Sequence, residues 1–156
     1  MTRVVLVGAA GRMGQALREA AGAAGVQVVA GVDTRTDAPG VTHAALADVA
    51  GEGLVVIEFA GPAGARQAAE TCAARGWALV SGSTGLAAED ERALEAAAAR
   101  VPVFRASNFS VGVAALRAAL AAALAAVPGW DVEIVERHHR LKKDSPSGTA
   151  LTLADD

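Results

Sequence analysis

Short apolar runs, each closed by a glycine or a polar turn, recur along the chain and constrain its fold more than any other feature. Because the residues in these runs do not alternate between apolar and polar, we expect strands that are buried on both faces. The pattern predicts an α/β fold in which helices cover both sides of a doubly wound parallel sheet. We expect strands at 3–7, 26–32, 54–59, 77–80 and 102–106, and helices at 13–24, 61–75, 89–100 and 113–127.

A glycine-rich turn joins the first expected strand to the first expected helix. It has the form GxxGxxG, with glycines at positions 8, 11 and 14, whereas the usual dinucleotide fingerprint is GxGxxG. Such glycines make a tight turn, admit a pyrophosphate close to the backbone, and let the helix pack against the sheet. The N–H groups of the helix start then bind the phosphate, with which Arg12 can also pair. The turn therefore predicts a Rossmann-type dinucleotide-binding domain.

Asp33 strengthens this prediction, because it closes the second expected strand, where a carboxylate accepts hydrogen bonds from a ribose diol. A carboxylate repels a 2′-phosphate, and Arg35 lies close enough in the sequence to soften that repulsion. We therefore expect NADH to be accepted and leave NADPH open. The alternative is that the glycines only make a tight turn and that Asp33 caps a loop.

A basic segment near the end of the chain holds the densest set of titratable donors, namely His138, His139 and Lys142. An enzyme that uses a nicotinamide cofactor moves a hydride and needs a matching proton, which histidine or a lysine of lowered pKa can supply. Further on, Ser147 can cap a helix whose first residues, Gly148 and Thr149, expose N–H groups to a carboxylate. Two other interpretations stay open: a solvated basic loop with a simple helix cap, and a metal site at the paired histidines.

The character of the sequence changes after Gly129. A strand is expected over 131–137, followed by a polar loop and the first turns of a helix, and these cannot form a domain alone. We therefore expect a dinucleotide-binding domain at residues 1–127 and the start of an incomplete α+β substrate domain at 128–156.

Composition narrows the class of protein. The net charge of −3 gives no electrostatic reason to expect nucleic acid, and no apolar run is long enough to predict a membrane span. Met1 leads directly into the first expected strand, which leaves no room for a signal peptide. Cys72 is the only cysteine, so a disulfide framework is excluded. We expect a cytoplasmic protein without a metal, in which Trp77 and Trp130 are packing residues.

Several stretches resemble dihydrodipicolinate reductase (4-hydroxy-tetrahydrodipicolinate reductase) in order and approximate spacing, and HHxxKxDxPSGTA is the most specific of them. They are GAAGRMG at 8–14, GSTG at 82–85, NFSVG at 108–112, ERHH at 136–139, Lys142, and DSPSGTA at 144–150. The resemblance implies that NADH or NADPH reduces a small anionic dicarboxylate to tetrahydrodipicolinate in the diaminopimelate and lysine pathway. It also implies a homotetramer for the full-length family, whose members continue into a mixed sheet.

The resemblance assigns roles residue by residue. His138 would be the acid/base residue and Lys142 the proton donor, while the substrate carboxylates would bind His139, Ser147, Gly148 and Thr149. The cofactor would contact Gly8, Ala9, Ala10, Gly11, Arg12, Met13, Asp33, Gly82, Ser83, Thr84, Ala106, Ser107, Asn108 and Phe109. Five positions depart from the family pattern: Glu58 replaces an aspartate, Ala60 a hydroxyl residue and Ala114 an asparagine, while Ser83 for threonine and Ser145 for alanine are small changes.

Two rival functions remain. Aspartate-semialdehyde dehydrogenase has a similar glycine turn but needs a cysteine nucleophile, and Cys72 lies in an Ala-rich segment that we expect in the core. The other rival is a non-catalytic dinucleotide-binding module, or an inactive fragment of the reductase.

Overall fold

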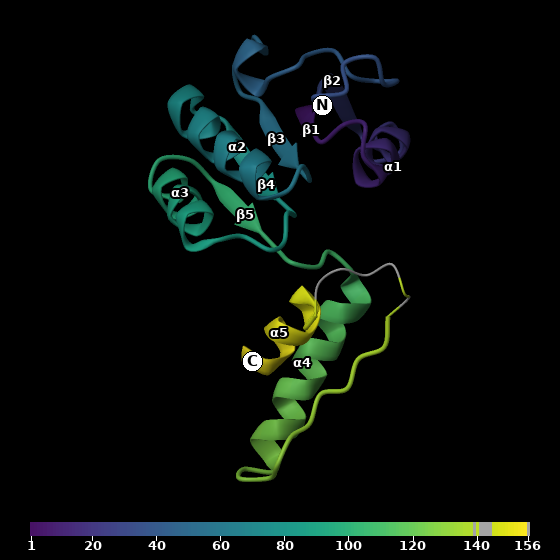
Figure 1. The fold of residues 1–156 in the computed structure, drawn as a ribbon, viewed down its shortest axis with the longest axis vertical. Coiled ribbons are helices and arrows are strands. Elements are labelled where there is room, and N and C mark those ends of the chain that lie inside the picture. The colour runs from purple at the N-terminus through teal and green to yellow at the C-terminus, as the bar shows by residue number, and fades with distance from the viewer. Residues whose placement is uncertain (139, 141–144, 156) are drawn as a thin grey trace. The chain divides into compact units, whose positions relative to one another are not determined.

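The computed structural model describes residues 1–138, 140 and 145–155 (Figure 1). The chain forms two compact units, Met1–Ala106 and Ser107–Asp156. The first unit contains five strands, three α-helices and a short 3₁₀ helix. In chain order these are β1 (Thr2–Val7), α1 (Arg12–Ala21), β2 (Val26–Val32), η1 (Leu46–Asp48), β3 (Val55–Glu58), α2 (Pro62–Arg75), β4 (Ala78–Ser81), α3 (Ala88–Ala98) and β5 (Val103–Arg105).

The five strands form one parallel sheet in the order β2-β1-β3-β4-β5. From β1 the chain moves outward to β2 and later returns to the other side of β1 with β3. Such a reversal of strand order opens a crevice at the carboxyl ends of the two central strands, where α/β proteins bind their ligands. The predicted fold class is confirmed, and the bounds of all five predicted strands agree with the observed ones to within one residue.

Both faces of the sheet are covered, which explains why the strands are mostly apolar. Val5 and Val7 of β1 belong to a large buried cluster that includes residues of α2 and α3, among them Ala68 and Leu94. The alternate residues of β1 point to the opposite face, where they form a smaller cluster that the apolar side of α1 partly covers. Figure 1 accordingly shows α2 and α3 side by side and α1 next to β1 and β2.

The second unit contains the helices α4 (Val111–Ala126) and α5 (Gly148–Asp155). Ser110 caps α4, since its Oγ accepts a hydrogen bond from Val113 N at 3.4 Å. The strand predicted over 131–137 is wrong, because these residues form neither strand nor helix. A strand needs a neighbour to pair with, and the described part of this unit contains no other strand.

The boundary between the two compact units falls in the chain between Ala106 and Ser107, so α4 belongs to the second unit. The sequence analysis had placed this helix in the first domain. Compactness does not define a functional domain, and the predicted division into 1–127 and 128–156 stays a prediction. Among the described residues, no helix is both long enough and apolar enough to cross a membrane.

Candidate functional site

The glycine turn after β1 takes a shape that only glycine allows. Gly8 has a φ of 85°, and a Cβ there would lie 2.8 Å from the carbonyl oxygen of Phe59. At Gly14 a Cβ would lie 2.6 Å from Cα of Ala9, so the helix packs directly on the turn. Gly11 occupies the N-cap of α1 and offers no side-chain cap to the first N–H groups of the helix. The backbone of the turn therefore presents a helix N-terminus to the crevice.

Asp33 lies directly after β2 and is bonded to the turn that follows β1 and to Arg35 in its own turn. Its Oδ2 accepts a hydrogen bond from Ala10 N at 3.1 Å, and its Oδ1 accepts one from Arg35 N at 3.0 Å. The guanidinium Nε of Arg35 lies 3.3 Å from the same Oδ1. The Asp33 side chain is 9% exposed and that of Arg35 61%, so the carboxylate is held in place while its cationic partner reaches solvent.

These contacts determine the charge of Asp33. Burial alone would raise the pKa of this carboxyl above its ordinary value of 3.8. The hydrogen bonds from Arg35 and Ala10, together with the positive charge of Arg35, outweigh burial and leave the pKa lowered. Asp33 is therefore a charged acceptor at neutral pH, which suits hydrogen bonds from hydroxyl groups.

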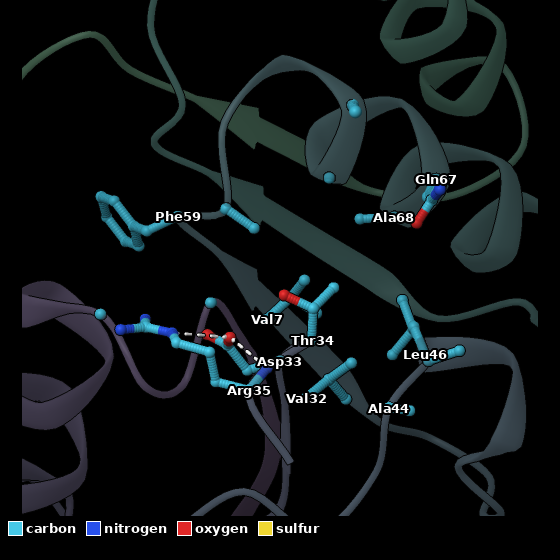
Figure 2. Close-up of a pocket in the computed structure, with 16 residues that line it drawn as sticks. Val7, Val32, Asp33, Thr34, Arg35, Ala44, Leu46, Phe59, Gln67 and Ala68 are labelled. Atoms are coloured by element: carbon cyan, nitrogen blue, oxygen red, sulfur yellow. Dashed lines mark hydrogen bonds and ion pairs between the residues drawn. The ribbon is translucent and has the colours of Figure 1, made fainter. Parts of the chain in front are cut away.

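A cavity of about 460 Å³ lies where the strand order reverses (Figure 2). Its walls come from the turns that follow β1, β2 and β3, from the segment just before and at the start of η1, and from α2. Three predicted cofactor contacts line it, namely Gly8, Gly11 and Asp33. The other predicted cofactor contacts in the glycine turn are neighbours of these residues in the chain. Ala9 and Ala10 are buried, and Arg12 and Met13 begin α1.

The remaining predicted cofactor contacts of the first unit follow the next strands along the same sheet edge. Gly82, Ser83 and Thr84 come directly after β4, and Ala106 follows β5, with its N–H bonded to Ser81 O at 3.2 Å. None of the four lines the cavity.

In the second unit, predicted cofactor and substrate residues meet. Asn108 Nδ2 donates a hydrogen bond to Thr149 Oγ1 at 3.1 Å, and Ser107 Oγ lies 3.0 Å from Thr152 Oγ1. Phe109 is 44% exposed. The structure therefore connects the segment before α4 to α5. The sequence analysis predicted that the first N–H groups of this helix bind a carboxylate.

Glu136 connects the predicted acid/base residue, His138, to the start of α5. Its Oε1 accepts a hydrogen bond from Ser147 N at 2.9 Å, and its Oε2 lies 3.7 Å from His138 Nδ1. The predicted cap is present, because Ser147 Oγ accepts a hydrogen bond from Ala150 N at 3.0 Å. Between these two bonded N–H groups stand those of Gly148 and Thr149, the pair that the sequence analysis assigned to a carboxylate. His139 and Lys142 lie outside the described residues.

Several residues of the site had no role assigned to them in the sequence analysis. Phe59, from the turn after β3, and Gln67, from α2, line the cavity. The position of Phe59 just after a strand was a usable signal, whereas Gln67 depends on how α2 packs. Glu136 was also missed, although it precedes the histidine pair in the sequence.

Comparisons with known proteins agree with one another. Family models described as the N-terminus and the C-terminus of dihydrodipicolinate reductase match residues 2–109 and 112–156. A relative from Thermomicrobium roseum, named 4-hydroxy-tetrahydrodipicolinate reductase, is 43% identical, with 99% of this chain and 64% of the relative covered. One of the same name from Stenotrophomonas maltophilia strain R551-3 is 46% identical, with 97% and 66% covered. The chain thus spans somewhat less than two thirds of the length of these relatives.

Solved structures show the same fold. A dipicolinate-bound dihydrodipicolinate reductase from Paenisporosarcina sp. TG-14 superposes with a TM-score of 0.71 at 23% identity, over 99% of this chain and 64% of that one. An aspartate dehydrogenase from Thermotoga maritima gives 0.54 at 18% identity, over 78% and 52%. At such identities the likeness concerns the fold alone.

Proposed function

This chain belongs to the dihydrodipicolinate reductase family, and from that premise we propose that it serves the reduction of 4-hydroxy-tetrahydrodipicolinate to tetrahydrodipicolinate by NADH or NADPH. The reaction belongs to diaminopimelate and lysine biosynthesis. The observation that carries the proposal is the carboxylate of Asp33, fixed by Ala10 and Arg35 beside a cavity at the reversal of strand order. That is the position from which a carboxylate binds the ribose of a dinucleotide.

In this proposal most residues that contact the cofactor belong to the first unit. Gly8, Gly11 and the N–H groups at the start of α1 receive the pyrophosphate, and Ala9, Ala10, Arg12 and Met13 complete that turn. The family resemblance assigns Gly82, Ser83, Thr84 and Ala106 of the first unit to the nicotinamide end, together with Ser107, Asn108 and Phe109 of the second. The bound cofactor supplies a hydride, and the residues of the chain orient it and supply the proton.

Cofactor preference depends on Asp33 and Arg35. The fixed, charged Asp33 favours NADH, because it accepts hydrogen bonds from the 2′ and 3′ hydroxyls and repels a 2′-phosphate. Arg35 is largely exposed and contacts Oδ1 of the same carboxylate. From this position its guanidinium can turn to a phosphate. We propose that NADH and NADPH are both used, with NADH bound more tightly.

The second unit handles substrate and proton. Gly148 and Thr149 offer backbone N–H groups to a substrate carboxylate, and the family resemblance assigns Ser147 and His139 to the same role. His138 acts as the acid/base residue and Lys142 as the proton donor. Glu136, within 3.7 Å of His138 Nδ1, orients the imidazole while it holds Ser147. A site of this kind suits a carboxylate of a dicarboxylate substrate, and the fold relative from Paenisporosarcina is described as dipicolinate-bound.

The cysteine-dependent rival loses support. Cys72 is fully buried in the core, and burial raises the pKa of its thiol to about 12. The reactive form of a cysteine is the thiolate, which such a site disfavours. The metal alternative at the paired histidines stays open, since His139 lies outside the described residues. The homotetramer implied by the family resemblance stays a prediction.

The test is NADH oxidation by this 156-residue chain, with substrate made in situ from pyruvate and aspartate semialdehyde by the preceding synthase. We expect turnover that falls by about a hundredfold or more in His138→Gln and Lys142→Ala, as loss of a general acid or base does. His43→Gln is the matched control, since His43 Nδ1 contacts Thr42 Oγ1 and does not line the cavity. Cofactor binding without turnover would support the non-catalytic alternative instead.

A further inference from the structure

Glu58 is a buried acidic residue at the end of an otherwise apolar strand. It closes β3, is 0% exposed, and lies next to the turn that lines the cavity. A carboxylate away from water is costly unless hydrogen bonds replace its hydration. The proposed mechanism gives Glu58 no role, so its burial calls for a reason.

Its hydrogen bonds supply that reason. Glu58 Oε1 accepts from Ala60 N at 2.5 Å and from Ser83 Oγ at 2.6 Å. Its Oε2 accepts from Ser81 Oγ at 2.8 Å. The Ser83 hydroxyl also accepts a hydrogen bond from Gly61 N at 2.8 Å, so its own proton is directed to Glu58. The carboxylate therefore receives three donors, each from a group that is itself fixed.

These bonds join two turns at the carboxyl edge of the sheet. One is the turn 59–61, of which Phe59 and Ala60 line the cavity. The other is the loop 82–84, which we propose for the nicotinamide end. The Phe59 ring packs against Gly82 so closely that any Cβ at that position would collide with it. The two turns are thereby held as one unit, with Glu58 and Ser83 underneath.

The opposite wall of the cavity is fixed by other means. Asp33 is held by Ala10 and Arg35, and none of these bonds involves Glu58. Loss of the Glu58 bonds should therefore loosen one wall and leave the other in place.

We propose that Glu58 is a positioning residue for the cofactor: it fixes Phe59 and the loop 82–84 in the geometry that receives the nicotinamide half of the dinucleotide. This inference rests on the proposed function, because it takes the cavity as the dinucleotide site. It concerns neither the adenosine end nor the proton transfer.

The test compares NADH with ADP-ribose, which lacks the nicotinamide, by calorimetric titration of the whole chain. Glu58→Gln keeps the length of the side chain but replaces one acceptor oxygen with a donor. We expect its dissociation constant for NADH to rise about tenfold, which is the usual scale for lost bonds to a buried charged group. The constant for ADP-ribose should change less than about twofold, because Asp33 and the glycine turn are untouched.

Ser81→Ala is the matched control. Ser81 donates to Glu58 as Ser83 does, but it has no bond to the turn 59–61. We expect NADH binding to weaken less in this variant than in Glu58→Gln, by about twofold. Thermal unfolding without ligand shows whether each variant is folded. If Glu58→Gln fails to fold, Glu58→Asp takes its place, because it keeps the charge but withdraws it from Ser81 and Ser83.

Three outcomes overturn the inference. A folded Glu58 variant that binds NADH as tightly as the wild type removes the positioning role. Equal weakening of NADH and ADP-ribose assigns Glu58 to the fold in general. A wild-type chain that binds neither ligand would refute the cofactor site itself, and with it the proposed function, whereas the first two results leave that function intact.

Discussion

The two compact units of the chain differ sharply in what they bury. The first unit encloses an apolar core that includes Trp77 at 1% exposure. In the described part of the second unit the only buried residue is Ser147, which is polar. Helix α4 is rich in alanine, valine and leucine, yet it has no buried residue. Apolar content alone therefore does not make a core.

The difference lies in the layers that each unit supplies. The first unit has a five-stranded sheet and helices for both of its faces, so most of its apolar side chains pack against another layer. The described second unit has two helices and an irregular segment, and no sheet. Trp130, predicted to be a packing residue, is 73% exposed, and that prediction is wrong, whereas the one for Trp77 is confirmed.

Thiol accessibility should separate the units most strongly. Cys72 is fully buried and its pKa is raised to about 12, so a thiol reagent should react with it only when the first unit opens. A cysteine introduced by Ala121→Cys lies on exposed α4 and should react immediately. We expect the two rates to differ on the order of a thousandfold or more.

The control for this experiment is the same labelling in denaturant, where both thiols should react alike. If the introduced thiol reacted as slowly as Cys72 under native conditions, α4 would be covered in solution. The contrast between the units would then be broken.

Glycine substitutions test how tightly the first unit is packed. Gly14→Ala places a Cβ against the backbone of the turn and should cost about 2 to 3 kcal/mol of unfolding free energy. Gly22, at the other end of α1, has an αR backbone and nothing within 4 Å of a Cβ. Gly22→Ala should therefore stabilise the protein by about 0.5 kcal/mol. Urea unfolding measures both, and a similar effect at the two sites would contradict the close packing at Gly14.

The fold of the first unit could be predicted because its rules are local. Each strand consists mostly of apolar residues, and each turn carries the glycine or polar residue that the chain needs there. The strand predicted over 131–137 failed for the opposite reason. Its apolar residues at 132, 134 and 135 favour a strand, but a strand also needs a paired neighbour. Whether a partner strand is available depends on the whole fold, and the sequence of the segment alone does not determine it.

In the candidate site, too, some features follow from the local sequence and others depend on the whole fold. Asp33 could be assigned because a residue that follows a strand must lie at the carboxyl edge of the sheet. The bond of Asp33 to Ala10 and the hydrogen bonds from Ser81 and Ser83 to Glu58 depend on side-chain positions across several strands. No spacing in the sequence reports such contacts. The catalytic and binding roles assigned to these residues stay predictions.

The second unit has two helices that begin with a serine cap, one buried and one exposed, and the strength of the two caps can be compared. Ser147 is buried and accepts from Ala150 N at 3.0 Å, while Ser110 is exposed and accepts from Val113 N at 3.4 Å. Ser147→Ala should speed amide exchange of Ala150 about fivefold, which corresponds to a cap of about 1 kcal/mol. Ser110→Ala should speed exchange of Val113 by about twofold or less.

The threonine variants at 147 and 110 retain a hydroxyl and should stay close to the wild type. Equal acceleration in the two alanine variants would mean that burial adds nothing to the Ser147 cap. The comparison between the buried and the exposed cap would then show no difference.

Asp33 gives the smallest effect and tests whether hydrogen bonds or burial dominate in the first unit. Its pKa is lowered below 3.8 in the folded chain, so the unfolded chain takes up a proton first as the pH falls. The stability that Asp33 contributes is therefore complete above about pH 5 and declines as the pH passes below 3.8 towards the folded pKa. Asp33→Asn has a similar shape and cannot titrate. Its difference from the wild type in unfolding free energy should be about 1 kcal/mol or less at neutral pH, because Arg35 is exposed.

Urea unfolding of both proteins between about pH 6 and pH 3 measures that difference, and it should shrink on acidification. If the difference grew instead, the pKa of Asp33 would be raised, and burial would outweigh the bonds from Ala10 and Arg35. A neutral Asp33 could still accept hydrogen bonds, but it would no longer repel a 2′-phosphate. The preference for NADH would then need another cause, so this small stability difference also tests the proposed cofactor selection.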